Sequence, residues 1–246
     1  MMDPFNGKTW WIVGASEGLG RALAEALDAA GARLVLSARG ADRLEAVASG
    51  LRDARVVPMD VSDAGSVQRA AKAAGAVDGV IYCVGLYDPM PATRWQPGAP
   101  EAMVEANFTG ALRVLGRVLP GMVARGAGRI VLIGSLAGHR GLPGAIGYGA
   151  SKAALMHLGE NLRVDLRGTG VRVQLANPGF IRTRLTEKND FPMPQIMEPA
   201  DAAARVIGAI RSGRFSTSFP APFSWLFTIG RHLPIGLFHR LFGARG

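Results

Sequence analysis

Short runs of apolar, mostly β-branched residues alternate with alanine-rich segments through the first two thirds of the chain, and this alternation restricts the fold more than any other feature. Runs such as Trp11-Ile12-Val13 and Arg129-Ile130-Val131-Leu132-Ile133 have the composition of strands that helices cover on both faces. The pattern predicts strands at residues 9–13, 33–37, 55–59, 77–84, 129–133 and 171–176. It predicts helices at residues 19–30, 42–52, 66–74, 101–125 and 148–167.

This alternation predicts an α/β fold with a parallel sheet, right-handed crossovers and helices on both faces. No segment of low complexity divides the chain, so we expect one domain over residues 1–246, with loops at 86–100 and 183–199. Ligands of doubly wound sheets bind beyond the carboxyl ends of the strands. Functional residues are therefore expected just after the strands, at one edge of the sheet.

The composition argues against several classes of protein. Only four of the 28 basic residues are lysines and the arginines are scattered, so the net charge of +9 does not indicate a nucleic-acid-binding surface. No cluster of His, Cys and Asp has the spacing of a metal site. A single cysteine (Cys83), no visible secretory signal and no apolar run of about 18 residues favour a cytoplasmic protein.

Three glycines follow the first predicted strand, in the segment Gly14-Ala15-Ser16-Glu17-Gly18-Leu19-Gly20. Gly14 permits a tight turn, Gly18 lets the backbone approach a pyrophosphate, and Gly20 permits close packing of helix on strand. Free N–H groups at the start of the helix would then face the anion. The spacing differs from the common G-x-G-x-x-G motif, so these glycines alone also fit a turn that binds no ligand.

The end of the second strand, Ser37-Ala38-Arg39, indicates which dinucleotide fits. An acidic residue there would bind the ribose hydroxyls of NAD, and none is present. Arg39 offers a guanidinium for the 2′-phosphate of NADP, to which Ser16 and Ser37 could donate further hydrogen bonds; a solvated arginine is the alternative. Asp60 and Val61 close the third strand and could meet the adenine, although Asp60 fits a cap or turn residue nearly as well.

The segment Tyr148-Gly149-Ala150-Ser151-Lys152 is the most informative in the chain. Residues four apart share a helix face, so Tyr148 and Lys152 can converge on one ligand. A nearby ammonium lowers the pKa of a phenol from about 10, which makes Tyr148 a candidate acid–base catalyst. Ser135 follows a predicted strand and could hold a carbonyl or alcohol oxygen. Asn107, a mediocre helix former within 101–125, could bind a water that passes protons toward Lys152.

Together these segments resemble the short-chain dehydrogenase/reductase family over about residues 8–220. The resemblance implies a seven-stranded Rossmann-like sheet, hydride transfer at nicotinamide C4, a Ser–Tyr–Lys–Asn catalytic set, and a homodimer or homotetramer. Where the family commonly has Asn-Asn-Ala-Gly, this chain has Tyr82-Cys83-Val84-Gly85, which keeps the last glycine. The matching elements are the glycine-rich turn, Asp60, Asn107, Ser135, Tyr148, Lys152 and Asn177-Pro178-Gly179.

The resemblance also covers the segment after the sixth strand. A threonine of the family meets the nicotinamide carboxamide there, and Thr183 occupies that place, followed by a substrate lid at about 183–199. The expected catalytic residues are Asn107, Ser135, Tyr148 and Lys152. The residues expected to bind NADP(H) are Gly14, Ser16, Gly18, Leu19, Gly20, Ser37, Arg39, Asp60, Val61, Gly85, Tyr148, Lys152, Pro178, Gly179, Ile181 and Thr183.

The C-terminal segment, about residues 219–246, combines arginines with many apolar side chains and has no acidic residue. Two interpretations stay open: its apolar groups cover the substrate cleft or a subunit contact, or they lie in a membrane interface. Pro220, Pro222 and Pro234 break the segment into short pieces, which slightly disfavours a continuous interfacial helix.

We therefore expect an NADP(H)-dependent oxidoreductase that interconverts a carbonyl and an alcohol, with Tyr148 as general acid–base and a hydrophobic ketone or aldehyde as substrate. The alternatives are a non-catalytic NADP-binding or scaffold protein on the same fold, and an enzyme attached to the inner face of a membrane. The fold alone does not name the substrate.

Overall fold

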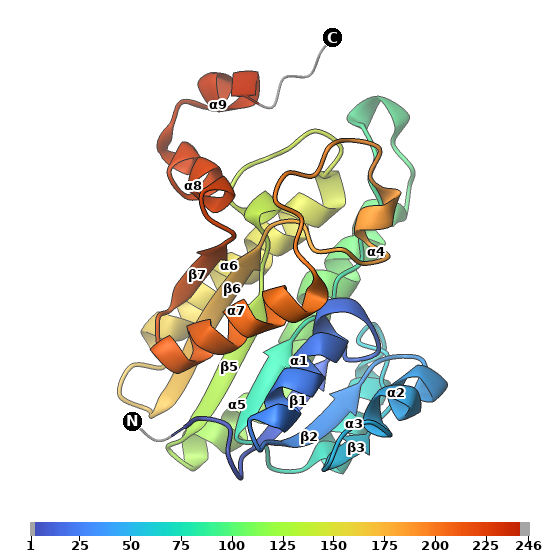
Figure 1. Cartoon of the computed structure of the whole chain (residues 1–246), viewed down its shortest axis with the longest axis vertical. Helices are drawn as coiled ribbons and strands as arrows, with labels where there is room; N and C mark the ends of the chain where they lie inside the picture. The colour runs from blue at the N-terminus through green and yellow to red at the C-terminus, as the bar shows by residue number, and fades with distance from the viewer. Residues whose placement is uncertain (1–2, 242–246) are drawn as a thin grey trace.

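The centre of the molecule is a sheet of seven parallel strands in the order β3-β2-β1-β4-β5-β6-β7 (Figure 1). This computed structural model describes residues 3–241. The α/β class predicted from the alternation is confirmed, and so are the seven strands that the resemblance implied. The strands are β1 (Thr9–Val13), β2 (Arg33–Ser37), β3 (Ala54–Val56), β4 (Gly79–Tyr82), β5 (Gly128–Ile133), β6 (Val171–Pro178) and β7 (Ser216–Phe219).

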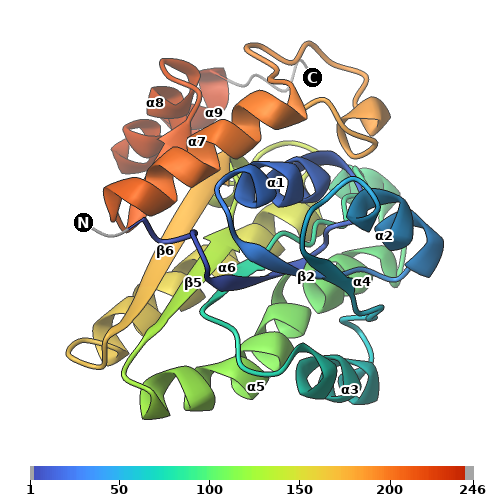
Figure 2. The same cartoon turned by 60° about the horizontal axis from the view of Figure 1, so that its bottom comes forward.

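Helices cover both faces of this sheet (Figure 2). One face carries α1 (Gly18–Ala29), α2 (Ala41–Ala48) and α7 (Pro199–Ser212), and the other carries α3 (Ala64–Ala74), α5 (Gly110–Ala124) and α6 (Ile146–Asp165). Because successive side chains of a strand point to opposite faces, Trp10 packs in the first layer and Trp11 in the second, both fully buried. A single strand thus contributes to both halves of the core.

The direction of the strand order changes between β1 and β4. From β1 the sheet runs through β2 to β3, and from β4 it runs through β5 and β6 to β7. The carboxyl ends of the strands beside such a switch point usually form the ligand site. The predicted site residues follow these strands and therefore meet at one edge.

The helix predicted at residues 101–125 is not continuous. It begins as α4 (Ala99–Val104) and passes through a π-helical turn at Glu105–Thr109 before α5 starts at Gly110. In a π-turn each hydrogen bond spans five residues instead of four, so the side chains that follow are rotated about the axis. Asn107 lies inside this turn, where its side chain bonds outside its own helix.

After β7 the chain continues as short helices at the carboxyl edge of the sheet, the same end as segment 183–199 (Figure 1). They are α8 (Phe223–Thr228), a 3₁₀ turn at Gly230–His232 and α9 (Ile235–Leu241). Pro234 separates the last two, in keeping with the broken segment that the sequence predicted. Residues 242–246 of that segment, with Phe242 and Arg245, lie outside the described residues. The other 3₁₀ turns are Ala92–Arg94, Leu136–Gly138 and Thr186–Lys188.

Candidate active site

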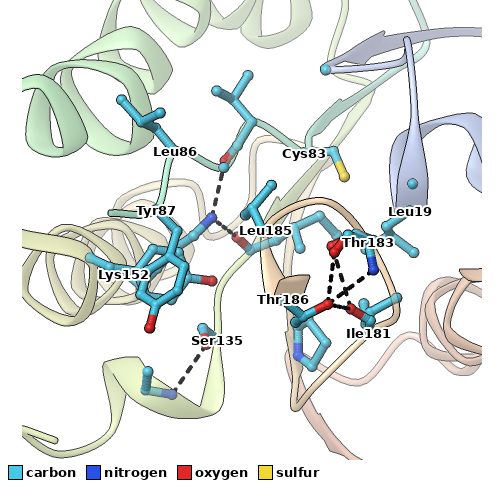
Figure 3. Close-up of a pocket in the computed structure, with 18 of the residues that line it drawn as sticks. Leu19, Cys83, Leu86, Tyr87, Ser135, Lys152, Ile181, Thr183, Leu185 and Thr186 are labelled. Atoms are coloured by element: carbon cyan, nitrogen blue, oxygen red, sulfur yellow. Dashed lines mark hydrogen bonds between the residues drawn. The ribbon is translucent and has the colours of Figure 1, made fainter. Parts of the chain in front are cut away.

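A large cavity opens at the carboxyl edge of the sheet (Figure 3). Its volume is about 1380 Å³, above the roughly 300–1,000 Å³ of a typical single-ligand site. The cavity therefore has room for a dinucleotide and a second molecule. Its walls come from the glycine-rich turn, the ends of several strands, α6, segment 183–199 and α8. All the predicted site residues except Ser37 and Asn107 line it.

The glycine-rich turn has the geometry that only glycine allows. Gly14 and Gly18 have φ angles of +98° and +54°, in the region that other residues rarely adopt. A Cβ on Gly20 would lie 1.9 Å from the carbonyl oxygen of Gly14, so α1 starts in direct contact with the turn. No side chain caps the N-terminus of α1. The N–H groups of its first turn are therefore oriented toward the cavity edge, as an anion site requires.

Segment 183–199 closes against this turn. A Cβ on Gly18 would lie 2.8 Å from Cγ2 of Thr183, so the two backbones approach because Gly18 has no side chain. The Arg184 guanidinium donates to Glu17 Oε1 at 2.6 Å, and Arg43 lies 3.7 Å from the other carboxylate oxygen. The predicted lid thus lines the cavity and contacts the glycine-rich turn through both packing and charge.

Arg39 and Asp60 lie on the wall of the cavity beyond the glycine-rich turn. Arg39 is exposed to solvent within the cavity. Asp60 Oδ1 accepts hydrogen bonds from the N–H (2.9 Å) and the hydroxyl (2.6 Å) of Ser62. These bonds, and more weakly the charge of Arg39, hold the pKa of Asp60 below its usual value. Asp60 is therefore a turn residue, as one interpretation of the sequence had it, whose carboxylate also faces the cavity.

The prediction that Ser37 binds the nucleotide is wrong. Its side chain is fully buried in the sheet, where Oγ donates to the Val57 carbonyl at 2.6 Å and accepts from Trp11 Nε1 at 2.9 Å. Its carbonyl oxygen accepts from the N–H groups of Gly14 (2.7 Å) and Ala15 (3.1 Å). Ser37 therefore shapes the glycine-rich turn from behind, which leaves Arg39 and Ser16 as candidates for a phosphate.

Tyr148 and Lys152 project from the first turns of α6 into the cavity, on one face of the helix as their spacing predicts. Lys152 Nζ lies 5.9 Å from the centroid of the Tyr148 ring. The ammonium donates to the carbonyl oxygens of Ile133 (2.9 Å) and Val84 (3.1 Å), at the ends of β5 and β4 (Figure 3). An ammonium has three N–H donors, so one remains for a ligand.

The electrostatics of this pair differ from the expectation. Burial raises the pKa of Tyr148, and hydrogen bonding to Ser135 opposes that rise. Burial also lowers the pKa of Lys152 to about 8, because its ammonium is almost fully removed from water. Desolvation is thus the largest cause of both shifts, and the lowered pKa expected for Tyr148 is not found. Tyr148 is a neutral phenol at pH 7, which is the state a proton donor needs.

The Asn107 side chain bonds to protein groups, and the water that we expect it to hold near Lys152 stays a prediction. Oδ1 accepts from the Leu86 N–H (2.7 Å), while Nδ2 donates to the Leu86 carbonyl and to Ser151 Oγ, both at 2.9 Å. Both N–H groups of the amide are thereby used, and the side chain is fully buried outside the cavity wall. Ser151 Oγ in turn donates to the Tyr148 carbonyl at 2.8 Å. Asn107 therefore joins the loop after β4 to α6 beside Tyr148.

Tyr87 is a cavity residue that the sequence reasoning missed. Its ring meets the Tyr148 ring edge-on, with centroids 5.1 Å apart, and its hydroxyl donates to Asn189 Oδ1 at 2.9 Å. Lys188 Nζ donates to its carbonyl oxygen at 2.9 Å. Burial raises the pKa of Tyr87 to about 12. Tyr87 thus links Tyr148 to segment 183–199. Its position two residues after Gly85 is the one feature of the sequence that could have indicated its place in the cavity.

Aromatic side chains form the far wall of the cavity. Phe180 stacks on Phe223 with ring centroids 5.7 Å apart, and it meets Phe191 at 5.9 Å. Phe223 meets Phe227 of the same helix at 5.2 Å. All four rings line the cavity, which ties segment 183–199 and α8 into one apolar wall.

A family model described as short chain dehydrogenase matches residues 8–192 of the chain. An uncharacterized oxidoreductase of Myxococcus xanthus is 39% identical over 245 residues, covering 96% of this chain and 97% of that protein. Among solved structures, a short chain dehydrogenase from Burkholderia cenocepacia in complex with NADP is similar, with a TM-score of 0.87 and 26% identity over 97% of this chain and 98% of that one. A putative betaketoacyl-ACP reductase has a TM-score of 0.78 and 31% identity, covering 87% of this chain and 95% of the other.

Proposed function

Since the chain belongs to the short-chain dehydrogenase family of oxidoreductases, we propose that it is an NADP(H)-dependent reductase of hydrophobic ketones or aldehydes, with Tyr148 as the proton donor. The observation that carries this proposal is the pairing of Tyr148 with Lys152, 5.9 Å from ring centroid to Nζ, on the wall of a cavity that begins at a glycine-rich turn. In this proposal the glycine-rich turn binds the nucleotide, and Tyr148 with Lys152 handles the proton.

The residues at the end of the cavity beside the glycine-rich turn fit a dinucleotide. The glycine-rich turn leaves a cradle without side chains, because a Cβ on Gly14 or Gly20 would meet backbone atoms at 3.0 Å or less. The uncapped start of α1 suits the pyrophosphate, and Arg39 suits a 2′-phosphate. When bound, NADPH supplies the hydride that reduces the carbonyl carbon.

The chain's own residues handle the proton. Tyr148 donates its phenolic proton to the carbonyl oxygen as negative charge develops there. Ser135, whose hydroxyl bonds to Tyr148, holds the same oxygen. Lys152 is fixed by two carbonyl oxygens and has one donor left for the nucleotide ribose. An anionic nucleotide beside Lys152 would favour its charged form and raise its pKa again.

The substrate end of the cavity favours an apolar molecule. Phe180, Phe191, Phe223 and Phe227 form its wall, with Leu142, Met193 and Leu226 beside them. A carboxylate or phosphate packed against these rings would lose its hydration, which is costly. A ketone or aldehyde with a bulky hydrocarbon or aryl group fits this wall.

Assembly as a homodimer or homotetramer completes the proposal. Large apolar side chains are exposed on α5 and α6, among them Leu112, Val123 and Val164, which is 56% exposed. Apolar groups of this size on adjacent helices are typical of subunit contacts. Light scattering of the purified protein would give the number of subunits.

The enzyme is expected to oxidise NADPH in the presence of apolar ketones or aldehydes and to leave small charged carbonyls unreduced. Absorbance of NADPH, followed with a panel that varies the size and charge of the carbonyl compound, measures this. Tight NADPH binding with no turnover across the panel would reject the reductase and favour a protein that only binds the nucleotide.

Replacing Arg39 with alanine is expected to raise KM for NADPH by roughly 10- to 100-fold and to leave KM for NADH unchanged, since a charged hydrogen bond contributes about 1.5–3 kcal/mol. Arg21→Ala is the matched control, because Arg21 is an exposed arginine of α1 that pairs with Glu25 outside the cavity. Equal changes in KM for NADPH and NADH in Arg39→Ala would show that the guanidinium does not bind the 2′-phosphate.

A further inference from the structure

Helix α8 has two apolar faces, and only one of them lines the cavity. Phe223, Leu226 and Phe227 line the cavity. Trp225 and Ile229, one helical turn apart, point away from it and are 58% and 65% exposed. In α9, Ile235 and Leu237 are 56% and 47% exposed. We call the set Trp225, Ile229, Ile235 and Leu237 the α8–α9 face.

The charge carried by α8 and α9 has one sign. Residues 202–241 include no aspartate or glutamate, whereas Arg231 and Arg240 are exposed beside the apolar side chains. Acidic groups at this end of the molecule lie outside α8 and α9, on Asp88 of loop 86–100, which pairs with Lys188, and on Glu187 and Asp190 of segment 183–199. Exposed Trp, Ile and Leu interspersed with arginines are typical of segments that lie in the interface of an anionic membrane.

The α8–α9 face is held in place by the rest of the protein. The Arg140 guanidinium donates to the Leu233 carbonyl and lies 5.9 Å from the ring centroid of Phe238. Phe238 is fully buried and packs against Phe227 with ring centroids 6.3 Å apart. Since these contacts already order the two helices, binding a surface through them would cost little conformational entropy.

Two other exposed aromatic side chains belong to segments at the same end of the molecule. Segment 183–199 and loop 86–100 both emerge at the carboxyl edge of the sheet with α8 and α9 (Figure 1). Phe191 and Trp95, in these segments, are 45% and 52% exposed. A flat surface that meets α8 and α9 would therefore face the end of the molecule where the cavity lies.

We propose that the α8–α9 face attaches the protein to the surface of an anionic lipid bilayer. Trp225, Ile229, Ile235 and Leu237 enter the interface, and Arg231 and Arg240 pair with lipid phosphates. Within residues 3–241 no helix combines the length and hydropathy needed to cross a bilayer, so the attachment is peripheral. It does not depend on the reductase activity, and the two proposals can fail separately.

The test is sedimentation of the full chain with vesicles of phosphatidylcholine alone and of phosphatidylcholine mixed with phosphatidylglycerol. The wild type is expected to pellet with the anionic vesicles. Trp225→Ser combined with Ile229→Ser should weaken that binding at least tenfold, because two large apolar side chains lose their place in the interface. Arg231→Gln combined with Arg240→Gln should weaken binding to the anionic vesicles about 25-fold, roughly fivefold for each charge removed. It should not change binding to vesicles of phosphatidylcholine.

Matched variants separate these effects from damage to the fold. Trp225→Leu with Ile229→Leu keeps much of the apolar area and should keep most of the binding. Arg167→Gln with Arg172→Gln removes the same charge at the opposite edge of the sheet and should leave binding unchanged. The proposal is overturned if the wild type does not pellet with anionic vesicles, or if the serine variant pellets as the wild type does. A smaller oligomer in the serine variant, without vesicle binding by the wild type, would mean that a second copy covers this face.

Discussion

Tyr148→Phe is expected to lower kcat by about 10²–10⁴-fold, the usual contribution of a positioned general acid, while NADPH binds as in the wild type. The substitution removes one oxygen and leaves the ring, which keeps its place 5.1 Å from the ring of Tyr87 and 5.9 Å from Lys152 Nζ. The carbonyl oxygen then loses the phenol that donates to it, and Ser135 is a far weaker acid. Stopped-flow or steady-state NADPH oxidation measures kcat, and quenching of protein fluorescence by NADPH measures binding.

Tyr87→Phe is the matched control for this experiment. The Tyr87 hydroxyl bonds to Asn189 of segment 183–199, so its loss should alter KM by a few-fold and leave kcat largely intact. Equal losses of kcat in both variants would mean that Tyr148 is not the specific proton donor, and full activity of Tyr148→Phe would reject the mechanism.

The pH profile gives a second measurement on the same residue. Burial raises the pKa of the Tyr148 phenol, so its protonated form persists through neutral pH. Reduction needs that form, and its rate should therefore stay level around pH 7 and fall only at alkaline pH, as the phenol loses its proton. A rate that falls between pH 6 and 8 would point to a different acid.

Sequence patterns located six of the seven strands and most of the predicted cavity residues, because both follow from local rules; β7 was not predicted, and β3 ends at Val56 instead of residue 59. β1 and β2 have the predicted boundaries, since apolar runs covered on both faces are short and bounded by polar residues. Gly14 and Gly18 have positive φ angles, and a Cβ on Gly20 would meet Gly14, so these restrictions arise within a few residues of the same turn. Tyr148 and Lys152 share a helix face for the same local reason.

Sequence patterns did not reveal the side chains that bond to segments far away in the sequence. Ser37 bonds to Trp11 and Val57, which makes its prediction wrong, and Asn107 bonds to Leu86 and Ser151. Neither partner could be chosen from spacing, because the pairings exist only once β1, β3 and α6 have been brought together. The π-helical turn at Asn107 has the same origin, since it orients that side chain toward the loop after β4 and α6.

The pKa of Tyr148 shows a different limit of sequence reasoning. The sequence places Lys152 four residues after Tyr148, and this spacing predicted a lowered pKa for the phenol. The depth at which Tyr148 is buried could not be predicted, and the resulting desolvation raises its pKa instead. The same burial lowers the pKa of Lys152 to about 8, so its charge depends on what occupies the cavity.

Gly20→Ala is expected to destabilise the protein by about 3 kcal/mol or more and to abolish measurable NADPH binding. The new methyl group would lie 1.9 Å from the Gly14 carbonyl oxygen and 2.8 Å from its carbonyl carbon, which are backbone atoms that cannot move aside as a side chain can. Relief requires α1 to move away from β1, and that movement opens the turn on which the pyrophosphate would rest. For a chain of this length such a loss corresponds to a fall in Tm of roughly 6–12 °C.

Gly208→Ala separates this steric effect from the general effect of alanine on a helix. Gly208 is an exposed residue of α7, and a Cβ there would meet nothing within 4 Å. Alanine should therefore raise the free energy of unfolding by about 0.5–1 kcal/mol, because it restricts the unfolded chain. Thermal unfolding of both variants with and without NADPH measures the contrast. A Gly20→Ala variant with the Tm of Gly208→Ala and a normal response to NADPH would show that α1 does not need its close contact with the turn, and the proposed nucleotide cradle would lose its geometric basis.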